Sequence, residues 1–404
     1  MSTLLGWIIF IVAISVSVIL HEFGHFATAK AFKMKATQFF MGFGPTLWSF
    51  RKGETEYGIK AIPAGGFVKI TGMTSMDEVD PEDEPRSFRR HPAWQRIIVL
   101  VAGSTMHFLL AMILLLAIPL GIGLQRLDPS STIGTVVNCV PKTDQSGCVK
   151  GEPDSPAAQL GLKPGDKITG LAGRPVHTWA QFTTEIGQVK LGSRVAVTVQ
   201  QDGREFTKTV QLAQTRQVGS NGKPGKSVAF LGVSQGAVFQ TTGVGKAFSW
   251  AGSMFSQAVT GTASVVSTLP SAFSFSHLFG ADRGQTAAGQ VTSIVGVGEI
   301  TSDVVASAGG WQAKVYLVLL IVVSVNIFIG LLNLVPLLPL DGGHVAIVLY
   351  EKVRDLVARM RGRPAPGLVD ITKLIPVSLG VFAVIIGFSL LLVVADIVNP
   401  INLG

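Results

Sequence analysis

Charged residues are scarce in this sequence of 404 residues: Asp, Glu, Lys and Arg together make up only 14%, about half the share found in ordinary globular domains. Hydrophobic residues make up 48% and are gathered into a few long runs. This balance excludes an ordinary soluble enzyme and indicates an integral membrane protein. The basic residues form no cluster that would indicate a nucleic-acid partner, and no internal repeat indicates a solenoid.

Four apolar runs are long enough to cross a bilayer, which needs roughly 20 residues: about Leu4–Ala27, Ile97–Gly123, Tyr316–Leu340 and Ile375–Val398. A fifth stretch, Ala247–Phe275, is dense in Ser, Thr, Gln and Gly, and we expect a surface or interfacial helix there. The first run could also be a cleaved signal peptide. However, no Lys or Arg precedes Lys30, and the apolar core is longer than that of a signal peptide.

The distribution of basic residues predicts the orientation, because cytoplasmic loops carry an excess of Lys and Arg. Eleven such residues lie from Lys30 to Arg96 and six from Glu351 to Lys373, whereas the two termini carry none. We therefore expect both termini outside, these two loops in the cytoplasm and the long middle segment outside.

The predicted divisions are helix 1 at 1–31, a cytoplasmic membrane-associated β-region at 32–96, helix 2 at 97–123, an extracytoplasmic region at 124–312, helix 3 at 313–350, a cytoplasmic loop at 351–373 and helix 4 at 374–398.

The two non-helical regions show strand patterns. Alternating apolar residues between turn signals predict strands in the first loop at Thr46–Phe50, Glu56–Ile62 and Gly66–Thr71, and in the outer region at Ile133–Val137, Lys167–Leu171, Arg194–Gln200 and Phe206–Leu212, with a helix at Trp179–Val189. Both cysteines, Cys139 and Cys148, fall in the outer region, where disulfides persist. We expect a disulfide between them, with two free thiols as the alternative.

The first apolar run contains the sequence His21-Glu22-Phe23-Gly24-His25. On a helix, residues i and i+4 share one face, so both imidazoles can bind one zinc ion, and the adjacent Glu22 can take a proton from a zinc-bound water. An acid within a membrane helix costs roughly 2.5–3.5 kcal/mol, which favours a functional role over a structural one. Two buried histidines and a glutamate paired with neighbouring helices remain the alternative.

A catalytic zinc site usually has three protein ligands, and Asp341 is the candidate for the third. It follows Pro336 and Pro339 near the end of the third run, in Asn333-Leu-Val-Pro-Leu-Leu-Pro-Leu-Asp341. The first and third runs both cross from outside to inside, so His21 and Asp341 should lie at one depth, toward the cytoplasmic side. Irregular backbone is tolerated at that depth only where it is buried or lines a wet cavity. Capping of the following helix by Asp341 is the alternative.

The two motifs together resemble those of the site-2 proteases, which are intramembrane zinc metalloproteases, and most closely the actinobacterial members of the regulator-of-sigma-E type. Gly42-Phe-Gly-Pro45, Glu56–Gly72 and Ser293–Gly296 also fit that family. The resemblance implies one Zn²⁺ bound by His21, His25 and Asp341, with Glu22 as the general base. It further implies that Asn333 contacts the substrate backbone and that the strand containing Phe67 and Val68 pairs with an unwound substrate.

By the same resemblance, the expected task is the second cleavage of single-span membrane proteins, notably anti-sigma factors already trimmed by another protease, in a bacterial plasma membrane. One departure concerns the second run, where much of the family has Ala-Gly-Pro-x-x-Asn and this chain has Ala102-Gly-Ser-Thr-Met-His107. His107 could replace that Asn as a hydrogen-bonding partner near the site, and we expect it to pack beside the site rather than to bind zinc.

A further resemblance, to bacterial PDZ domains, is carried by Ser155-Pro-Ala-Ala-Gln-Leu-Gly-Leu-Lys-Pro-Gly-Asp166 and by Gly173 and Trp179. It implies an extracytoplasmic α+β PDZ-like domain at about 132–213, so the expected fold is a polytopic four-helix membrane protein carrying that domain. The domain could bind peptide termini, but we favour a size filter that excludes untrimmed substrates. The competing hypotheses are a membrane-anchored peptidase with its site outside the bilayer, and a PDZ-bearing scaffold with a degenerate metal site.

Overall fold

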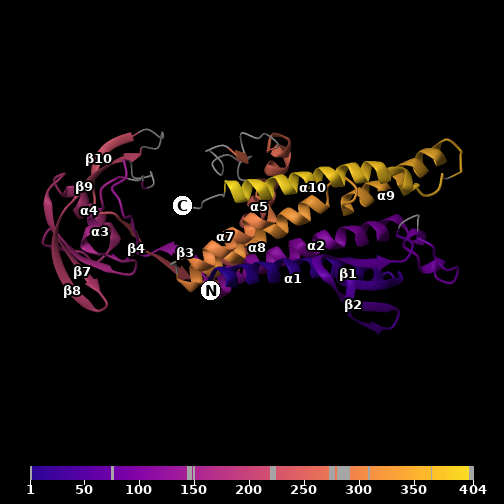
Figure 1. Cartoon of the computed structure of the whole chain (residues 1–404), viewed down its shortest axis with the longest axis horizontal. Helices are drawn as coiled ribbons and strands as arrows, with labels where there is room; N and C mark the ends of the chain where they lie inside the picture. Colours follow the sequence, from indigo (N-terminus) through magenta and orange to yellow (C-terminus); the bar gives the residue numbers. More distant parts are fainter. Residues whose placement is uncertain are drawn as a thin grey trace. The chain divides into compact units, whose positions relative to one another are not determined.

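The computed structural model describes residues 2–73, 77–142, 148, 151–218, 224–272, 278–279, 292–307, 310–364 and 366–399, and the chain forms two compact units. The helical unit comprises Met1–Ile122 and Thr242–Leu403, and the second unit comprises Gly123–Thr241. Four helices among the described residues are long and apolar enough to cross a membrane (Figure 1): α1 (Ser2–Ala31), α2 (Ala93–Ala117, continued by the π-helical turn η3 at Ile118–Ile122), α8 (Trp311–Asn333) and α10 (Ile375–Val398). They fit the predicted polytopic membrane protein.

The third predicted helix is interrupted. Helix α8 ends at Asn333, and a second helix, α9 (Asp341–Met360), begins only after a loop, so the break expected at Pro336 and Pro339 is present and the predicted division 313–350 holds two helices. The reason is that Pro336 and Pro339 have no N–H to donate to a helix. Helix α9 also occupies the first ten residues of the expected loop 351–373, and a 3-10 turn, η4 (Ile371–Leu374), ends that loop.

Strands β1 (Ala36–Lys52) and β2 (Thr55–Ile70) form a small curled sheet between α1 and α2. The sequence predicted three short strands here, but two long strands bend and pair twice. Phe39 pairs with both Val68 and Tyr57, and Tyr57 in turn pairs with Phe50. In space the segments therefore follow the order 66–70, 36–41, 56–59 and 46–52. Segment 66–70 is an edge of this sheet, with β1 on one side.

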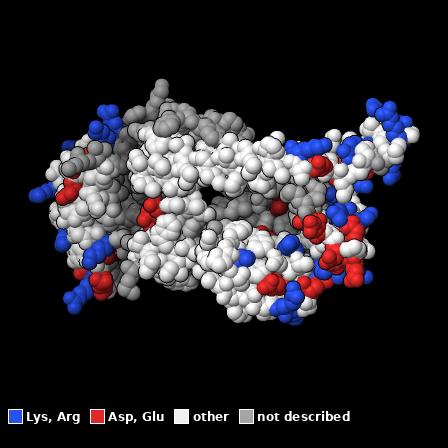
Figure 2. Space-filling model, turned by 45° about the vertical axis from the view of Figure 1, so that its right-hand side comes forward, with Lys and Arg blue, Asp and Glu red and all other residues white. Residues whose placement is uncertain are grey.

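Ion pairs join this sheet to the chain before α2. Glu54 accepts hydrogen bonds of 2.7 and 2.8 Å from the Arg86 guanidinium and also pairs with Lys30, at the end of α1. Hydrogen bonding to Arg86 is the main cause that lowers the pKa of Glu54 to about 2. Two short 3-10 turns, η1 (Glu84–Arg86) and η2 (Phe88–Arg90), carry the chain toward α2. On the face shown in Figure 2, charged side chains of the helical unit gather at one end of that unit, and few lie on the rest of it.

Two further helices pack against the spans. In α5 (Val244–Ala272), Ala251 is buried in a cluster with Leu115 of α2 and Val323 of α8; the last residues of the predicted interfacial helix, 273–275, lie outside the described residues. Helix α7 (Ile294–Ala306) packs along α1, where Ser302 contacts Gly6. The predicted outer region 124–312 is therefore not one body, because from Thr242 onward the chain belongs to the helical unit.

The second unit is built on an antiparallel sheet in the order β6-β5-β7-β8. Thr178 begins helix α4 with a capping box in which Gln181 is the partner, and Phe182 of α4 is buried in the core. The unit extends beyond the expected limit of 213 to Thr241. Its elements are β3 (Leu124–Leu127), β4 (Ile133–Val136), α3 (Pro156–Leu160), β5 (Lys167–Leu171), β6 (Arg174–Pro175), α4 (Trp179–Gln188), β7 (Arg194–Gln201), β8 (Arg204–Gln211), β9 (Ala213–Val218), β10 (Pro224–Phe230), β11 (Val233–Gln235) and β12 (Ala237–Gln240).

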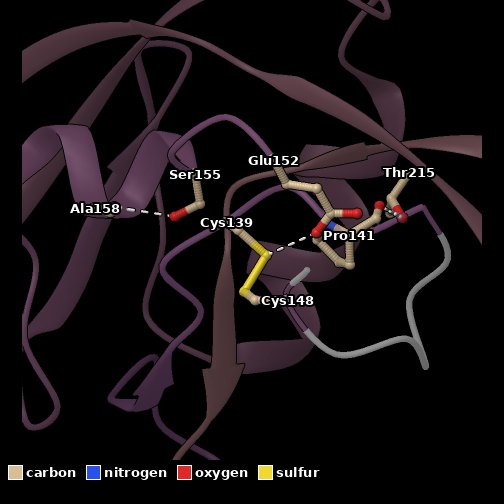
Figure 3. The surroundings of a disulfide bond; sticks show 7 residues. All are labelled: Cys139, Pro141, Cys148, Glu152, Ser155, Ala158 and Thr215. Carbon is tan, nitrogen blue, oxygen red and sulfur yellow. Dashed lines mark hydrogen bonds between the residues drawn. A yellow bond between two sulfur atoms is a disulfide. The ribbon is translucent and has the colours of Figure 1, made fainter. Parts of the chain in front are cut away.

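A disulfide joins Cys139 and Cys148 in this unit, with an S–S distance of 2.06 Å (Figure 3). Residues 143–147 of the loop that it closes lie outside the described residues. Beside it, the Thr215 hydroxyl donates a 2.9 Å hydrogen bond to the Pro141 carbonyl. The disulfide therefore ties the chain that follows β4 to the chain that precedes α3.

Candidate metal centre

His21 and His25 lie one turn apart on α1 and point to a common position. Their Nε2 atoms are 3.2 Å apart. Asp341 Oδ2 lies 3.4 Å from His21 Nε2 and 3.3 Å from His25 Nε2. The two helices that carry these residues, α1 and α9, are far apart in the sequence, so the structure brings together three groups that the sequence placed only at a similar depth.

The three atoms form a nearly equilateral triangle, and this allows a test of whether a metal fits. Atoms bound about 2.0–2.2 Å from a tetrahedral zinc ion lie about 3.3–3.6 Å from one another. The observed separations of 3.2, 3.3 and 3.4 Å are close to that value. Asp341 Oδ2 is buried and accepts no hydrogen bond from the described residues. A carboxylate oxygen facing two imidazole nitrogens in this way fits a cation site, and three ligands leave a fourth position for water.

His25 is held in the orientation that a ligand needs. Its Nδ1 lies 2.7 Å from the Val99 carbonyl oxygen of α2. A carbonyl can only accept, so Nδ1 carries the proton and the lone pair is on Nε2, which faces the other two groups. Such a backbone partner is typical of metal-binding histidines, because it fixes both the tautomer and the ring.

Asp341 is the first residue of α9, and the residue that precedes the helix, Leu340, makes no side-chain cap. The two glycines that follow Asp341 let the helix begin against the proline-containing loop. A Cβ at Gly342 would lie 2.3 Å from the Leu334 carbonyl oxygen, and one at Gly343 would lie 2.6 Å from the Leu338 nitrogen. The pair of glycines is therefore required to bring Asp341 to the histidines.

Glu22 lies beside the triangle and is oriented by the sheet. The backbone N–H of Val68 in β2 faces its carboxylate. A Cβ at Gly66 would lie 3.0 Å from the Glu22 side chain, so β2 passes close to α1 at this point. The Val68 N–H leaves the strand on the side away from β1, which means that the open edge of segment 66–70 faces Glu22.

The other predicted substrate-binding residues are near this edge or near the loop. The Phe67 ring stacks on Phe40 and Phe43, with ring centroids 5.7 and 6.1 Å apart, and so helps to hold the strand in the sheet. Asn333 is the last residue of α8 and is half-buried, immediately before the loop that leads to Asp341.

Sequence reasoning missed two features of the site. The first is Gly103 of α2, which contacts both imidazoles: a Cβ there would lie 2.4 Å from His25 Nε2 and 2.5 Å from His21 Cε1. The second is Asn326 of α8, which is fully buried and whose Oδ1 lies 2.8 Å from His107 Nδ1. A glycine in an apolar run and one Asn in a span were the only sequence signals. Among the described residues, the group of potential metal ligands consists of His21, His25 and Asp341.

Comparison with known proteins matches residues 9–365 to the model of Peptidase family M50. The chain is 35% identical to the zinc metalloprotease Rip1 of Mycolicibacterium smegmatis, over 99% of this chain and 98% of the relative. It is 34% identical to Rip1 of Mycobacterium tuberculosis, over 98% of each. The metalloprotease MmpA of Caulobacter vibrioides is 28% identical over 87% of this chain and 88% of its own length.

Among solved structures, the PDZ domain of an SdrC-like protein from Listeria monocytogenes matches 25% of this chain and 86% of its own, with 22% identity and a TM-score of 0.17. The family match and the relatives, by contrast, span nearly the whole chain. The resemblance of the paired motifs is thereby confirmed, and the chain belongs to peptidase family M50 as a zinc metalloendopeptidase of the site-2 protease family.

Proposed function

We propose that this protein performs the second cleavage in regulated intramembrane proteolysis, cutting single-span membrane proteins at a zinc site formed by His21, His25 and Asp341. The observation that carries the proposal is the triangle of ligand atoms with sides of 3.2–3.4 Å, with Glu22 beside it. The ligands come from two elements. Helix α1 is itself long and apolar enough to cross a membrane, and α9 follows another such helix, α8, after a short loop.

In this proposal Glu22 is the general base. A bound zinc ion would supply Lewis-acid activation of a water molecule and of the scissile carbonyl. Glu22 takes the proton of that water and delivers it to the leaving amine. His25 is kept in its ligand tautomer by Val99.

The substrate would bind as an added strand on the open edge of segment 66–70. This edge faces Glu22, so a peptide paired with it passes next to the base. Only an unwound segment has free N–H and C=O groups for such pairing. Asn333, at the end of α8 and immediately before the broken stretch, would contact the backbone of that segment.

The expected substrates are anti-sigma factors trimmed beforehand by a site-1 protease, in the plasma membrane of a bacterium. The loop charges favour both termini and the second unit outside, with the active site toward the cytoplasmic side. In this arrangement the second unit acts as a PDZ-like size filter against untrimmed proteins. Binding of peptide termini by that unit is the alternative.

The decisive experiment is Glu22→Gln, expressed with a single-span substrate whose outer domain has been removed. The variant should fold and bind one zinc ion per chain but should not cleave, because an amide cannot accept the proton. Glu56→Gln, a matched change on β2, should cleave at the wild-type rate. Cleavage by the Glu22→Gln protein would refute the assignment.

Two other functions are separated by zinc analysis. If Asp341→Asn keeps both zinc and activity, the site lies elsewhere, as expected for a membrane-anchored peptidase with its centre outside the bilayer. If the wild-type protein binds no stoichiometric zinc and cleaves nothing, it is a scaffold with a degenerate site. The separations at Asp341 favour the intramembrane peptidase over both.

A further inference from the structure

The two histidines of the site differ in their outer hydrogen bonds. His25 donates from Nδ1 to the Val99 carbonyl, but His21 Nδ1 is buried and has no hydrogen-bond partner among the described residues. If His21 binds a metal through Nε2, its remaining proton is on Nδ1. A buried N–H without an acceptor is destabilising, because it has lost its hydrogen bonds to water, so this atom needs a partner.

The Nδ1 edge of His21 faces α2. A Cβ at Gly103 would lie 2.7 Å from His21 Nδ1, so this helix passes directly over the atom. His107 lies four residues after Gly103, on the same face of α2 and one turn further along. The His21 and His107 rings are 5.1 Å apart between centroids. When two imidazoles share a hydrogen bond, the distance between their centroids is the nitrogen–nitrogen distance of about 3 Å plus the radius of each ring, or about 5 Å in all.

The tautomer of His107 follows from Asn326. The Asn326 amide donates from Nδ2 to the Val322 carbonyl, at 2.8 Å within α8. Its Oδ1 therefore faces His107, at 2.8 Å from Nδ1. Since Oδ1 can only accept, His107 carries its proton on Nδ1 and has a free lone pair on Nε2. Both side chains are almost completely buried.

We propose that His107 is the positioning residue of His21, accepting a hydrogen bond from His21 Nδ1–H through the Nε2 lone pair that Asn326 leaves free. These contacts join α8, α2 and α1. Helix α8 precedes the loop that leads to Asp341, and α1 contains His21. The inference rests on the proposed zinc site and adds the support of its first ligand.

One other acceptor is available on α2. The Ser104 hydroxyl is also buried without a hydrogen-bond partner among the described residues. Ser104 is turned by about 100° from Gly103 around the helix, whereas His107 is on the same face as Gly103. The ring contact therefore favours His107, and Ser104 serves as the competing variant in the test.

The test measures Zn²⁺ affinity of the full-length protein in detergent, by competition with a chromophoric chelator. His107→Phe keeps an aromatic ring but removes the acceptor, and should weaken zinc binding 10–100-fold, the usual effect of losing an outer hydrogen bond to a ligand. His107→Asn, which restores an acceptor, should recover most of that loss. Asn326→Leu combined with His107→Phe should be no worse than His107→Phe alone. Thr105→Val, on the exposed face of α2, is the matched control for folding.

A Co²⁺-substituted protein gives the second measurement, because its absorption reports the number of metal ligands. At saturating Co²⁺ the His107→Phe spectrum should keep the wild-type intensity, whereas loss of a ligand would change it and would overturn the positioning role in favour of direct binding. Wild-type zinc affinity in His107→Phe, or an equal loss in Ser104→Ala, would also overturn the inference. Absence of zinc from the wild type would instead refute the proposed function itself.

Discussion

Gly103→Ala tests the packing of α2 on the metal centre. The added Cβ would lie 2.4 Å from His25 Nε2, about 1 Å closer than an ordinary contact of 3.4 Å, and it would also lie 2.5 Å from His21 Cε1. Because two ring atoms are affected at once and α2 is fixed by its neighbours, the imidazoles must move by about that distance. A misplacement of 1 Å at a reacting centre costs about 10²-fold in rate, which corresponds to about 2.7 kcal/mol of transition-state stabilisation.

The fold should survive this substitution. Alanine favours a helix over glycine by about 0.8–1 kcal/mol, which offsets part of an overpacking cost of about 1–3 kcal/mol. The assay is kcat/KM on a trimmed single-span substrate together with zinc content, compared with Gly121→Ala, where the added Cβ meets no atom within 4 Å. If Gly103→Ala cleaves within about threefold of Gly121→Ala and keeps its zinc, the close approach of α2 to the histidines does not govern the site.

Two further predictions concern stability. The ion pairs of Glu54 lower its pKa to about 2. The stability from this carboxylate is therefore present above its unfolded pKa of about 4.5 and is lost as the pH falls from there toward 2. Glu54→Gln should lower the melting temperature at pH 7 but not at pH 2, and an equal loss at both pH values would contradict this. In Gly296→Ala, the new Cβ would lie 2.5 Å from Asp396 Oδ2, which accepts a 2.7 Å hydrogen bond from the Ser293 N–H at the start of α7. We expect a loss of about 1–3 kcal/mol in thermal unfolding, and no change in Gly310→Ala, where the space is open.

Much of the local structure could be predicted from the sequence. Apolar runs of sufficient length identified the four spans, since a membrane helix must satisfy its backbone within itself. The spacing of His21 and His25 required a helix, and turn residues marked the strands around Lys167–Leu171 and Arg194–Gln201. The prolines before Asp341 indicated a broken helix, and a new helix, α9, begins at that residue.

What the sequence determined by itself was the identity of the chemical groups and the helical runs that carry them, because helical period and run length are local properties. The tertiary structure decided which groups meet. Bending of β2 brings the Val68 N–H to Glu22, and Gly103 allows α2 to lie against two imidazoles. Asn326 selects the tautomer of His107 from a different helix. Such contacts join residues that are tens to hundreds of positions apart, and side-chain packing between elements rather than local spacing determines them.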